Sequence, residues 1–135
     1  MASGECNCGA VSFRIECPIT DVFICHCSIC RRATGNNGNA VVVIDNEYFH
    51  WLTGEALIST WRKPNHDWQI WFCRDCGSQV PGENDENTTF IPAGCITQGG
   101  DELKIAHHIY VGSKACWDEL PAVGQRHSDA FQGER

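Results

Sequence analysis

The sequence predicts a mainly β protein made of many short antiparallel strands, with metal-binding loops between the strands and one short helix. Three observations lead to this fold class. Short stretches in which apolar and polar residues alternate recur along the 135 residues, as half-buried strands require. Clusters of Gly, Asn and Pro separate these stretches. Seven of the ten cysteines fall into three tight groups.

The expected strands follow one another along most of the chain. In residues 10–16, "AVSFRIE", the side chains of Val11, Phe13 and Ile15 lie on one face of an extended chain. Similar patterns predict strands over residues 40–44, 56–61, 67–72, 88–94 and 103–111. The helix is expected near Ser28, whose hydroxyl is suited to cap one or two turns over "ICRRAT".

Length and composition favour one domain over residues 1–135, with residues 124–135 as a peripheral tail. No apolar run approaches the ~18 residues of a membrane span, and the first residues lack the pattern of a signal peptide. We therefore expect a cytoplasmic protein whose cysteines stay reduced instead of forming disulfides. The formal net charge of −7 disfavours nucleic-acid binding, because phosphates repel a negative chain.

The three cysteine groups are suited to bind two zinc ions. Closely spaced thiolates favour zinc, which accepts sulfur ligands in a tetrahedron. One expected site is structural and is closed by four thiolates, from Cys6, Cys8, Cys73 and Cys76. The second expected site has three thiolates, from Cys25, Cys27 and Cys30. Three protein ligands leave an open position, which distinguishes a catalytic zinc from a structural one.

Spacing alone leaves other arrangements of these ligands open. The groups could pair differently, or His26 could be the fourth ligand of the second ion and close that site. The isolated Cys17, Cys95 and Cys116 are expected as small buried hydrophobic residues. The five tryptophans are expected mostly in the core. His107 and His108 lie on an expected strand with side chains on opposite faces, so one should point inward.

An open zinc site can activate water, or it can bind and deprotonate an incoming thiol. A nucleotide deaminase is excluded, because no H-x-E or C-x-E precedes a P-C-x-x-C. For a thiol substrate, Arg31 and Arg32 directly follow the last ligand and could pair with its carboxylates. A solvated helix face accounts for these two arginines equally well.

Five segments of the chain, in this order, resemble the glutathione-dependent formaldehyde-activating enzyme family, also called the S-hydroxymethylglutathione synthase family. They are "GECNCGAVSFRIECP", "CHCSICRRATG", "FCRDCGSQVP", "PAG" and "HIYVGSKACWDELP". The resemblance implies an Mss4-like β-tent fold around a four-cysteine zinc. Cys6, Cys8, Cys73 and Cys76 match the structural ligands of the family, and Cys25, Cys27 and Cys30 match its catalytic zinc ligands.

The resemblance implies a carbon–sulfur lyase reaction, the reversible addition of glutathione or a similar thiol to formaldehyde or a related carbonyl. The chain departs from the family at Cys95, where a hydroxyl residue is common, and at Cys116, where proline is common. Two alternatives stay open beside the enzyme. One is a binding module that uses zinc only as a scaffold, and the other is a thiol reductase with Cys95 or Cys116 as its nucleophile.

Overall fold

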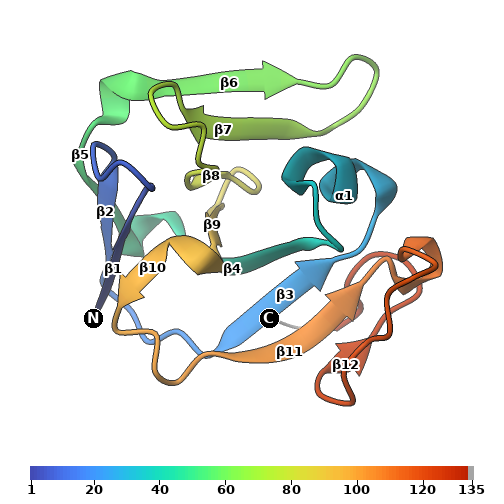
Figure 1. Cartoon of the computed structure of the whole chain (residues 1–135). Helices are drawn as coiled ribbons and strands as arrows, with labels where there is room; N and C mark the ends of the chain where they lie inside the picture. Colours follow the sequence, from blue (N-terminus) through green and yellow to red (C-terminus); the bar gives the residue numbers. More distant parts are fainter. Residues whose placement is uncertain (134–135) are drawn as a thin grey trace. The chain divides into compact units, whose positions relative to one another are not determined.

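The computed structural model describes residues 1–133, and Figure 1 shows its course. The chain divides into two compact units. The first unit is formed by Met1–Ile19 and Val42–Glu102, and the second by Thr20–Val41 and the described residues from Leu103 on. Strand β4, Asn39–Asp45, begins in the second unit and ends in the first.

The first unit contains a four-stranded antiparallel sheet and two further strand pairs. The sheet has the order β10-β1-β2-β5, formed by Ile96–Gln98, Ala2–Glu5, Ser12–Ile15 and Phe49–Thr53. Strands β6, Ile58–Arg62, and β7, Gln69–Cys73, form an antiparallel hairpin. Strands β8, Gly82–Glu83, and β9, Thr88–Pro92, form the other pair. Short 3-10 turns cover Asn46–Tyr48, Glu55–Leu57 and Ala93–Cys95.

The core of the first unit explains why β2 forms where the alternation predicts it. Phe13 and Ile15 point inward from β2 and are almost fully buried, while the alternate residues Ser12 and Arg14 are half-buried. The Phe13 ring packs against Phe49 and lies edge-on to Trp51, both on the neighbouring strand β5. Val11 and Val80 continue this core toward Cys6 and Cys73.

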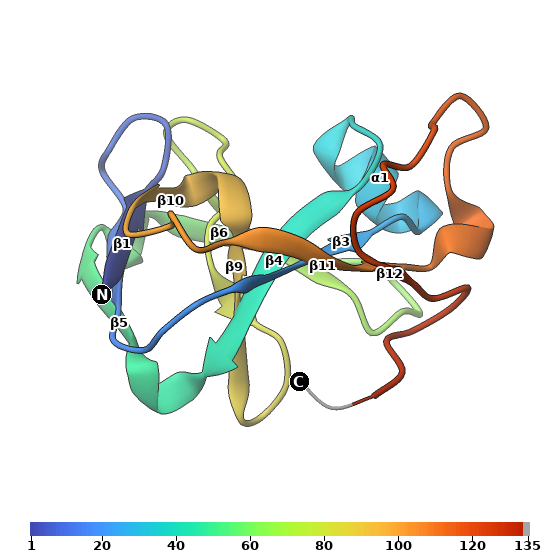
Figure 2. The ribbon, with the colours of Figure 1, turned by 90° about the horizontal axis from the view of Figure 1, so that it is seen from below.

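The second unit is built around strand β3, Asp21–Cys25, which leads into the one α-helix, α1, Ser28–Thr34. Strand β11, Lys104–Ile109, runs parallel to β3 on one side and to β12, Gln125–Arg126, on the other, as Figure 1 and Figure 2 show. The first residues of β4 pair antiparallel with β3. A 3-10 turn over Val111–Ser113 follows β11.

The predicted mainly β fold class is confirmed, with one short α-helix among residues 1–133 and mostly antiparallel pairing. The sequence pattern missed six strands, which are short or lack alternation: β1, β3, β5, β8, β10 and β12. The expected cap of the helix was wrong by one residue. Cys27 is the N-cap, and its sulfur accepts the backbone N–H of Cys30, so Ser28 is the first helical residue.

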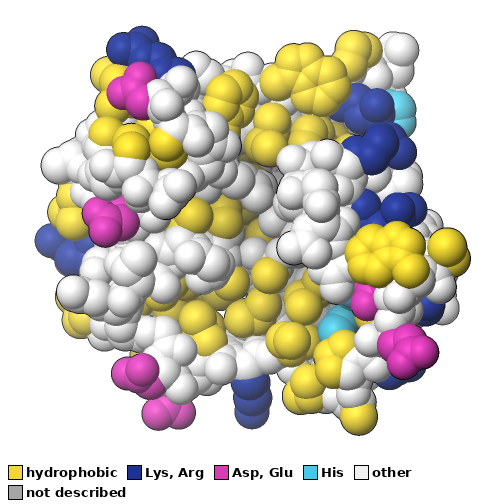
Figure 3. All heavy atoms as spheres, in the orientation of Figure 1, with side chains coloured by type: hydrophobic (Ala, Val, Ile, Leu, Met, Phe, Trp, Pro, Cys, Tyr) yellow, Lys and Arg dark blue, Asp and Glu magenta, His cyan; other side chains and the backbone are white. Residues whose placement is uncertain are grey.

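Expectations for burial were partly wrong. Trp61 and Trp117 are exposed by 51% and 68%, because each lies outside the packed cores, and the other three tryptophans are half-buried. Apolar side chains reach the surface in several places on the face seen in Figure 3. The expected tail contributes β12 and the buried His127, and Glu134 and Arg135 lie outside the described residues. No described helix is long and apolar enough to cross a membrane.

Candidate metal centres

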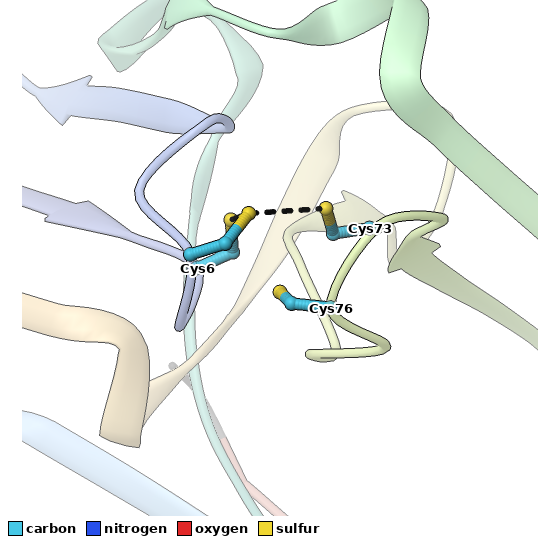
Figure 4. Close-up of side chains that lie close together, drawn as sticks. Cys6, Cys73 and Cys76 are labelled. Atoms are coloured by element: carbon cyan, nitrogen blue, oxygen red, sulfur yellow. Dashed lines mark hydrogen bonds between the residues drawn. The ribbon is translucent and has the colours of Figure 1, made fainter.

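Four thiols converge in the first unit. The loop between β1 and β2 carries Cys6 and Cys8, and the end of β7 and its following turn carry Cys73 and Cys76. The four sulfurs lie within 4.8 Å of one another. Figure 4 shows the side chains of Cys6, Cys73 and Cys76 pointing toward a common centre.

The spacing of these sulfurs fits zinc. The distance from Cys8 Sγ is 3.6 Å to Cys6 Sγ and 3.8 Å to Cys73 Sγ. Zinc bonds of about 2.3 Å to sulfur give a tetrahedron whose edges are about 3.8 Å. The four-thiol cluster therefore has the donor type and the size that a closed structural zinc site needs.

Glycines shape both loops of the four-thiol cluster. Gly9 follows Cys8 and Gly77 follows Cys76, with φ of +80° and +77°, a region that residues with a Cβ rarely adopt. Each glycine closes a turn by a backbone hydrogen bond: Gly9 N donates to Cys6 O, and Gly77 N donates to Cys73 O. Each turn thus places its two cysteine sulfurs close to those of the other turn.

Polar groups beside the four-thiol cluster favour the thiolate form of Cys76. Val11 N donates to Cys6 Sγ at 3.3 Å, and a hydrogen bond of 3.2 Å joins Cys76 Sγ and Ser78 Oγ. The hydroxyl and the backbone N–H of Ser78 lower the pKa of Cys76 to about 6. Ser78 Oγ is held in place by the backbone N–H of Asn7 at 2.9 Å. Hydrogen bonds to sulfur stabilise the charged form that binds a metal.

Three thiols converge in the second unit. Cys25 ends β3, Cys27 caps α1, and Cys30 lies in the first turn of the helix. Their sulfurs also lie within 4.8 Å of one another. Cys30 is buried and the other two are half-buried, so this three-thiol cluster has a side that solvent reaches. Gly38 lets the chain pass close by, because a Cβ there would lie 2.8 Å from Cys25 O.

Cys27 is the most acidic thiol of this cluster. Hydrogen bonds from the thiols of Cys25 and Cys30 lower the pKa of Cys27 to about 2, and the N–H groups of Cys30 and Ile29 add to the effect. The same contacts raise the pKa of Cys25 to about 11 and also raise the pKa of Cys30. Without a metal, Cys27 is therefore the thiolate of the cluster, and Cys25 and Cys30 keep their protons. A divalent cation can replace these two protons.

His26 is not placed to be a fourth ligand, so that alternative was wrong. Its Nε2 lies 2.9 Å from His108 Nδ1, and its Nδ1 lies 3.3 Å from Asn37 O, so both ring nitrogens have protein partners. Among residues 1–133, the metal-ligating side chains gathered at this cluster are the three cysteines alone. A metal bound there would keep a coordination position for another molecule.

The two arginines after the cluster differ in their environment. Arg31 is half-buried, and its buried Nε has no hydrogen-bond partner among the described residues. Arg32 is exposed. Both lie in the last turn of α1, where positive charge is favourable because the helix dipole is negative at that end.

The remaining cysteines belong to neither thiol cluster. Burial raises the pKa of Cys17 and of Cys95, and Cys95 Sγ donates to Gln79 O at 3.1 Å. A raised pKa does not suit Cys95 to act as a nucleophile. Cys116 is exposed, so the expectation of a buried hydrophobic residue was wrong there.

Sequence reasoning missed a buried histidine pair beside the three-thiol cluster. His108 points inward, as the alternation along its strand predicts for one of the two adjacent histidines. Its partner is His26, 82 positions earlier, and Asp118 lies 3.7 Å from the other ring nitrogen of His26. Burial lowers the pKa of His26, whereas Asn37 O and the Asp118 carboxylate raise it. No local pattern links positions so far apart, so the sequence had no signal for this pair.

Two known proteins resemble this chain, one in its fold and one in part of its sequence. A solved structure of a Rhodobacter sphaeroides protein superposes with a TM-score of 0.59, covering 73% of this chain and 91% of that one. The two chains are 20% identical, so the likeness concerns the fold. A Halomonas elongata protein, whose name places it with glutathione-dependent formaldehyde-activating enzymes, is 45% identical over 42 residues. That match spans 30% of this chain and 27% of the relative.

A family model matches far more of the chain. It covers residues 1–113, a stretch that includes both cysteine clusters and strand β11. This match extends over well more than half of the 135 residues. The chain therefore belongs to the glutathione-dependent formaldehyde-activating enzyme family.

Proposed function

We propose that this protein is a zinc-dependent carbon–sulfur lyase that adds a small thiol such as glutathione reversibly to formaldehyde or a related carbonyl. The three-thiol cluster carries the proposal, because its sulfurs converge without a fourth protein ligand among the described residues. Family membership supports the choice of thiol and carbonyl. In the forward reaction a carbon–sulfur bond forms, and the proton of the thiol ends on the new hydroxyl group.

In this proposal the two clusters have different roles, one structural and one catalytic. The four-thiol cluster holds a structural zinc, which links the β1–β2 loop to the turn after β7. The three-thiol cluster holds a second zinc, whose chemistry is to bind the incoming thiol at its open position and lower the pKa of that thiol. The protein residues around it hold the substrate and limit the access of water.

Charge is the reason to assign a role to Arg31 and Arg32. Three thiolates and one Zn²⁺ give the site a net charge of −1, and a substrate thiolate would make it −2. Accumulated charge in a half-buried site needs a positive neighbour. Arg31 fits this need best, because its buried Nε has no hydrogen-bond partner within residues 1–133. We therefore assign the carboxylates of a peptide thiol to Arg31 first and to Arg32 second.

The test must separate catalysis from the spontaneous reaction of thiols with formaldehyde. Exchange NMR with ¹³C-formaldehyde and glutathione at equilibrium measures how fast the free aldehyde and its thiol adduct interconvert. The zinc-loaded protein should raise the exchange rate above that without protein. Cys27→Ser should abolish the increase, and Cys116→Ser, which alters an exposed thiol outside both clusters, should keep it. An exchange rate at the protein-free level, with two zinc ions confirmed per chain, would favour a scaffold without this activity.

A further inference from the structure

We propose that His108 is a positioning residue for the three-thiol cluster and acts on it through His26. The inference rests on the proposed function only in that these three thiols bind a metal. His26 stands between two of the thiols in the chain, so its backbone is shared with the loop that carries Cys25 and Cys27. Whatever fixes the ring of His26 therefore also fixes the loop.

The contact between the two histidines is short and buried from solvent. His26 Nε2 and His108 Nδ1 are 2.9 Å apart, and the rings are near-parallel at 29°. His26 is 1% exposed and His108 is 0% exposed. Water does not compete for a hydrogen bond at such a site, and an unpaired partner would stay unpaired.

The direction of this hydrogen bond follows from its surroundings. His108 Nε2 lies 3.0 Å from Val123 O, and a carbonyl oxygen only accepts, so Nε2 carries a hydrogen. In a neutral His108 the other nitrogen, Nδ1, is then the acceptor. His26 Nδ1 also faces a carbonyl, but at 3.3 Å from Asn37 O against 3.0 Å for His108 Nε2 and Val123 O, so we assign the hydrogen between the two rings to His26 Nε2. His108 acts as a directional link from the backbone of residue 123 to the ligand loop.

Further contacts hold the loop from its other sides. His26 N donates to Ile109 O at 2.9 Å, so backbone and side chain both attach the loop to the end of β11. His26 Nδ1 faces Asn37 O at 3.3 Å and Asp118 Oδ2 at 3.7 Å. Asn37 Nδ2 in turn lies 3.3 Å from Asp118 Oδ2. With its hydrogen on Nε2, a neutral His26 has none on Nδ1 to donate to either oxygen, so Nε2 is the hydrogen-bonded nitrogen of the ring.

The position of His108 itself is set by packing. Gly124 has φ of +92°, and a Cβ there would lie 3.1 Å from His108 Cδ2 and 3.2 Å from Nε2. The chain after Val123 therefore passes directly over the ring. A ring that is clamped in this way provides a rigid acceptor, and partners that orient metal ligands are typically fixed in the same manner.

Two substitutions of His108 separate the role of its two nitrogens. In His108→Asn the side-chain oxygen can take the place of Nδ1 and accept from His26, while the donor to Val123 is lost. In His108→Gln the amide can reach toward Val123 O as a donor, while the acceptor near His26 is lost. Both variants carry a buried amide with one contact missing, so they are matched for polarity and for loss of stability.

The measurement is the affinity of each cluster for zinc, by competition with a chromophoric chelator, and for Co²⁺, by its visible thiolate spectrum. We expect His108→Gln to weaken binding at the three-thiol cluster about 10- to 100-fold, as for other residues that orient metal ligands. His108→Asn should stay within a few-fold of the unaltered protein. The four-thiol cluster is the internal reference and should not change in either variant. His107→Asn, on the neighbouring position of β11, is the external control.

A second measurement needs no variant. Long-range ¹H–¹⁵N spectra of the histidine rings should show His108 with hydrogen on Nε2 and none on Nδ1. Removal of the metal from the three-thiol cluster should shift the ring signals of His26 and His108 and leave those of His50 unchanged. The opposite tautomer of His108, or ring signals insensitive to that metal, would overturn the inference.

The outcomes also separate this inference from the proposed function. Equal metal affinities of His108→Gln and His108→Asn would overturn the positioning role and leave the function untouched. Two bound metals without faster formaldehyde exchange would refute the function and leave the positioning role intact. An unaltered protein that binds only one metal would refute both.

Discussion

Cys27 has two structural roles within one side chain. Its sulfur belongs to the three-thiol cluster and also accepts the N–H of Cys30 as the cap of α1. A hydroxyl can replace a thiol as a helix cap but is a far poorer ligand for zinc. The two roles can therefore be separated by one substitution.

We expect Cys27→Ser to lose the metal of the three-thiol cluster and all turnover while the fold persists. The cluster is held by one short loop, so its loss should cost less stability than loss of the other cluster. Cys73→Ser is the matched change in the four-thiol cluster and should unfold the first unit, because structural zinc supplies folding free energy directly. Metal content and thermal unfolding check both variants. Equal destabilisation by the two would argue against the division into catalytic and structural sites.

Arg31 and Arg32 are adjacent yet should contribute unequally to thiol binding. Arg31→Ala should weaken glutathione binding about tenfold, because its half-buried charge is poorly screened. Arg32→Ala should have a smaller effect, about twofold, as expected for an exposed ion pair. Calorimetric titration of zinc-loaded protein at low and high salt is the measurement. A larger effect at Arg32, or a loss at the exposed Arg32 that does not depend on salt, would contradict the assignment.

At the scale of elements, β11 and β12 are held together by an aromatic cluster. His107 Nδ1 lies 3.0 Å from His127 Nε2, and the His107 ring stacks on Phe23 and lies edge-on to Phe131. Burial and the nearby His127 lower the pKa of His107, and Asp21 opposes this. This cluster attaches residues 127–131 to β3 and β11, next to the pairing of β12 with β11.

The lowered pKa predicts that the attachment weakens in acid. The ordinary pKa of histidine is 6.5, and His107 in the folded protein titrates below it, so the unfolded chain binds more protons in between. The contribution of His107 is therefore complete above pH 6.5 and is lost as the pH falls from there through the folded pKa. Denaturant unfolding of the unaltered protein and of His107→Gln across this range measures it. Identical pH profiles for the two would contradict the prediction.

At the scale of the whole molecule, metal should control stability unequally in the two units. The four-thiol cluster joins loops 65 positions apart in sequence, whereas the three-thiol cluster spans six neighbouring residues. A graded chelator should therefore first remove the metal of the three-thiol cluster, with loss of amide protection confined to α1 and its loop. Removal of the second metal should then unfold the first unit, with protection lost first in the β1–β2 loop and the turn after β7. Hydrogen exchange followed by mass spectrometry reports both steps, and loss of protection throughout the chain in the first step would refute this order.

The sequence by itself determined the fold class, the family and the cysteine groups. The sequence pattern placed β2, β4, β6, β7, β9 and β11 because apolar residues recur within each of these segments, and that is a local property. The thiol groups were visible because metal ligands in one loop must be close in sequence. Burial of both faces hid β3, since "DVFIC" has too little alternation to be recognised.

Only the tertiary structure decided which distant parts meet. It brought the sulfurs of Cys8 and Cys73 to 3.8 Å, paired β11 parallel with β3, and set His108 against His26. It also gave the helix cap to Cys27, because the thiol cluster fixes that sulfur above the first turn. These contacts join residues far apart in the chain or depend on the arrangement of a whole cluster. The secondary-structure propensities of short segments cannot predict these contacts. Their free energy comes from packing and hydrogen bonds that exist only once the chain has folded.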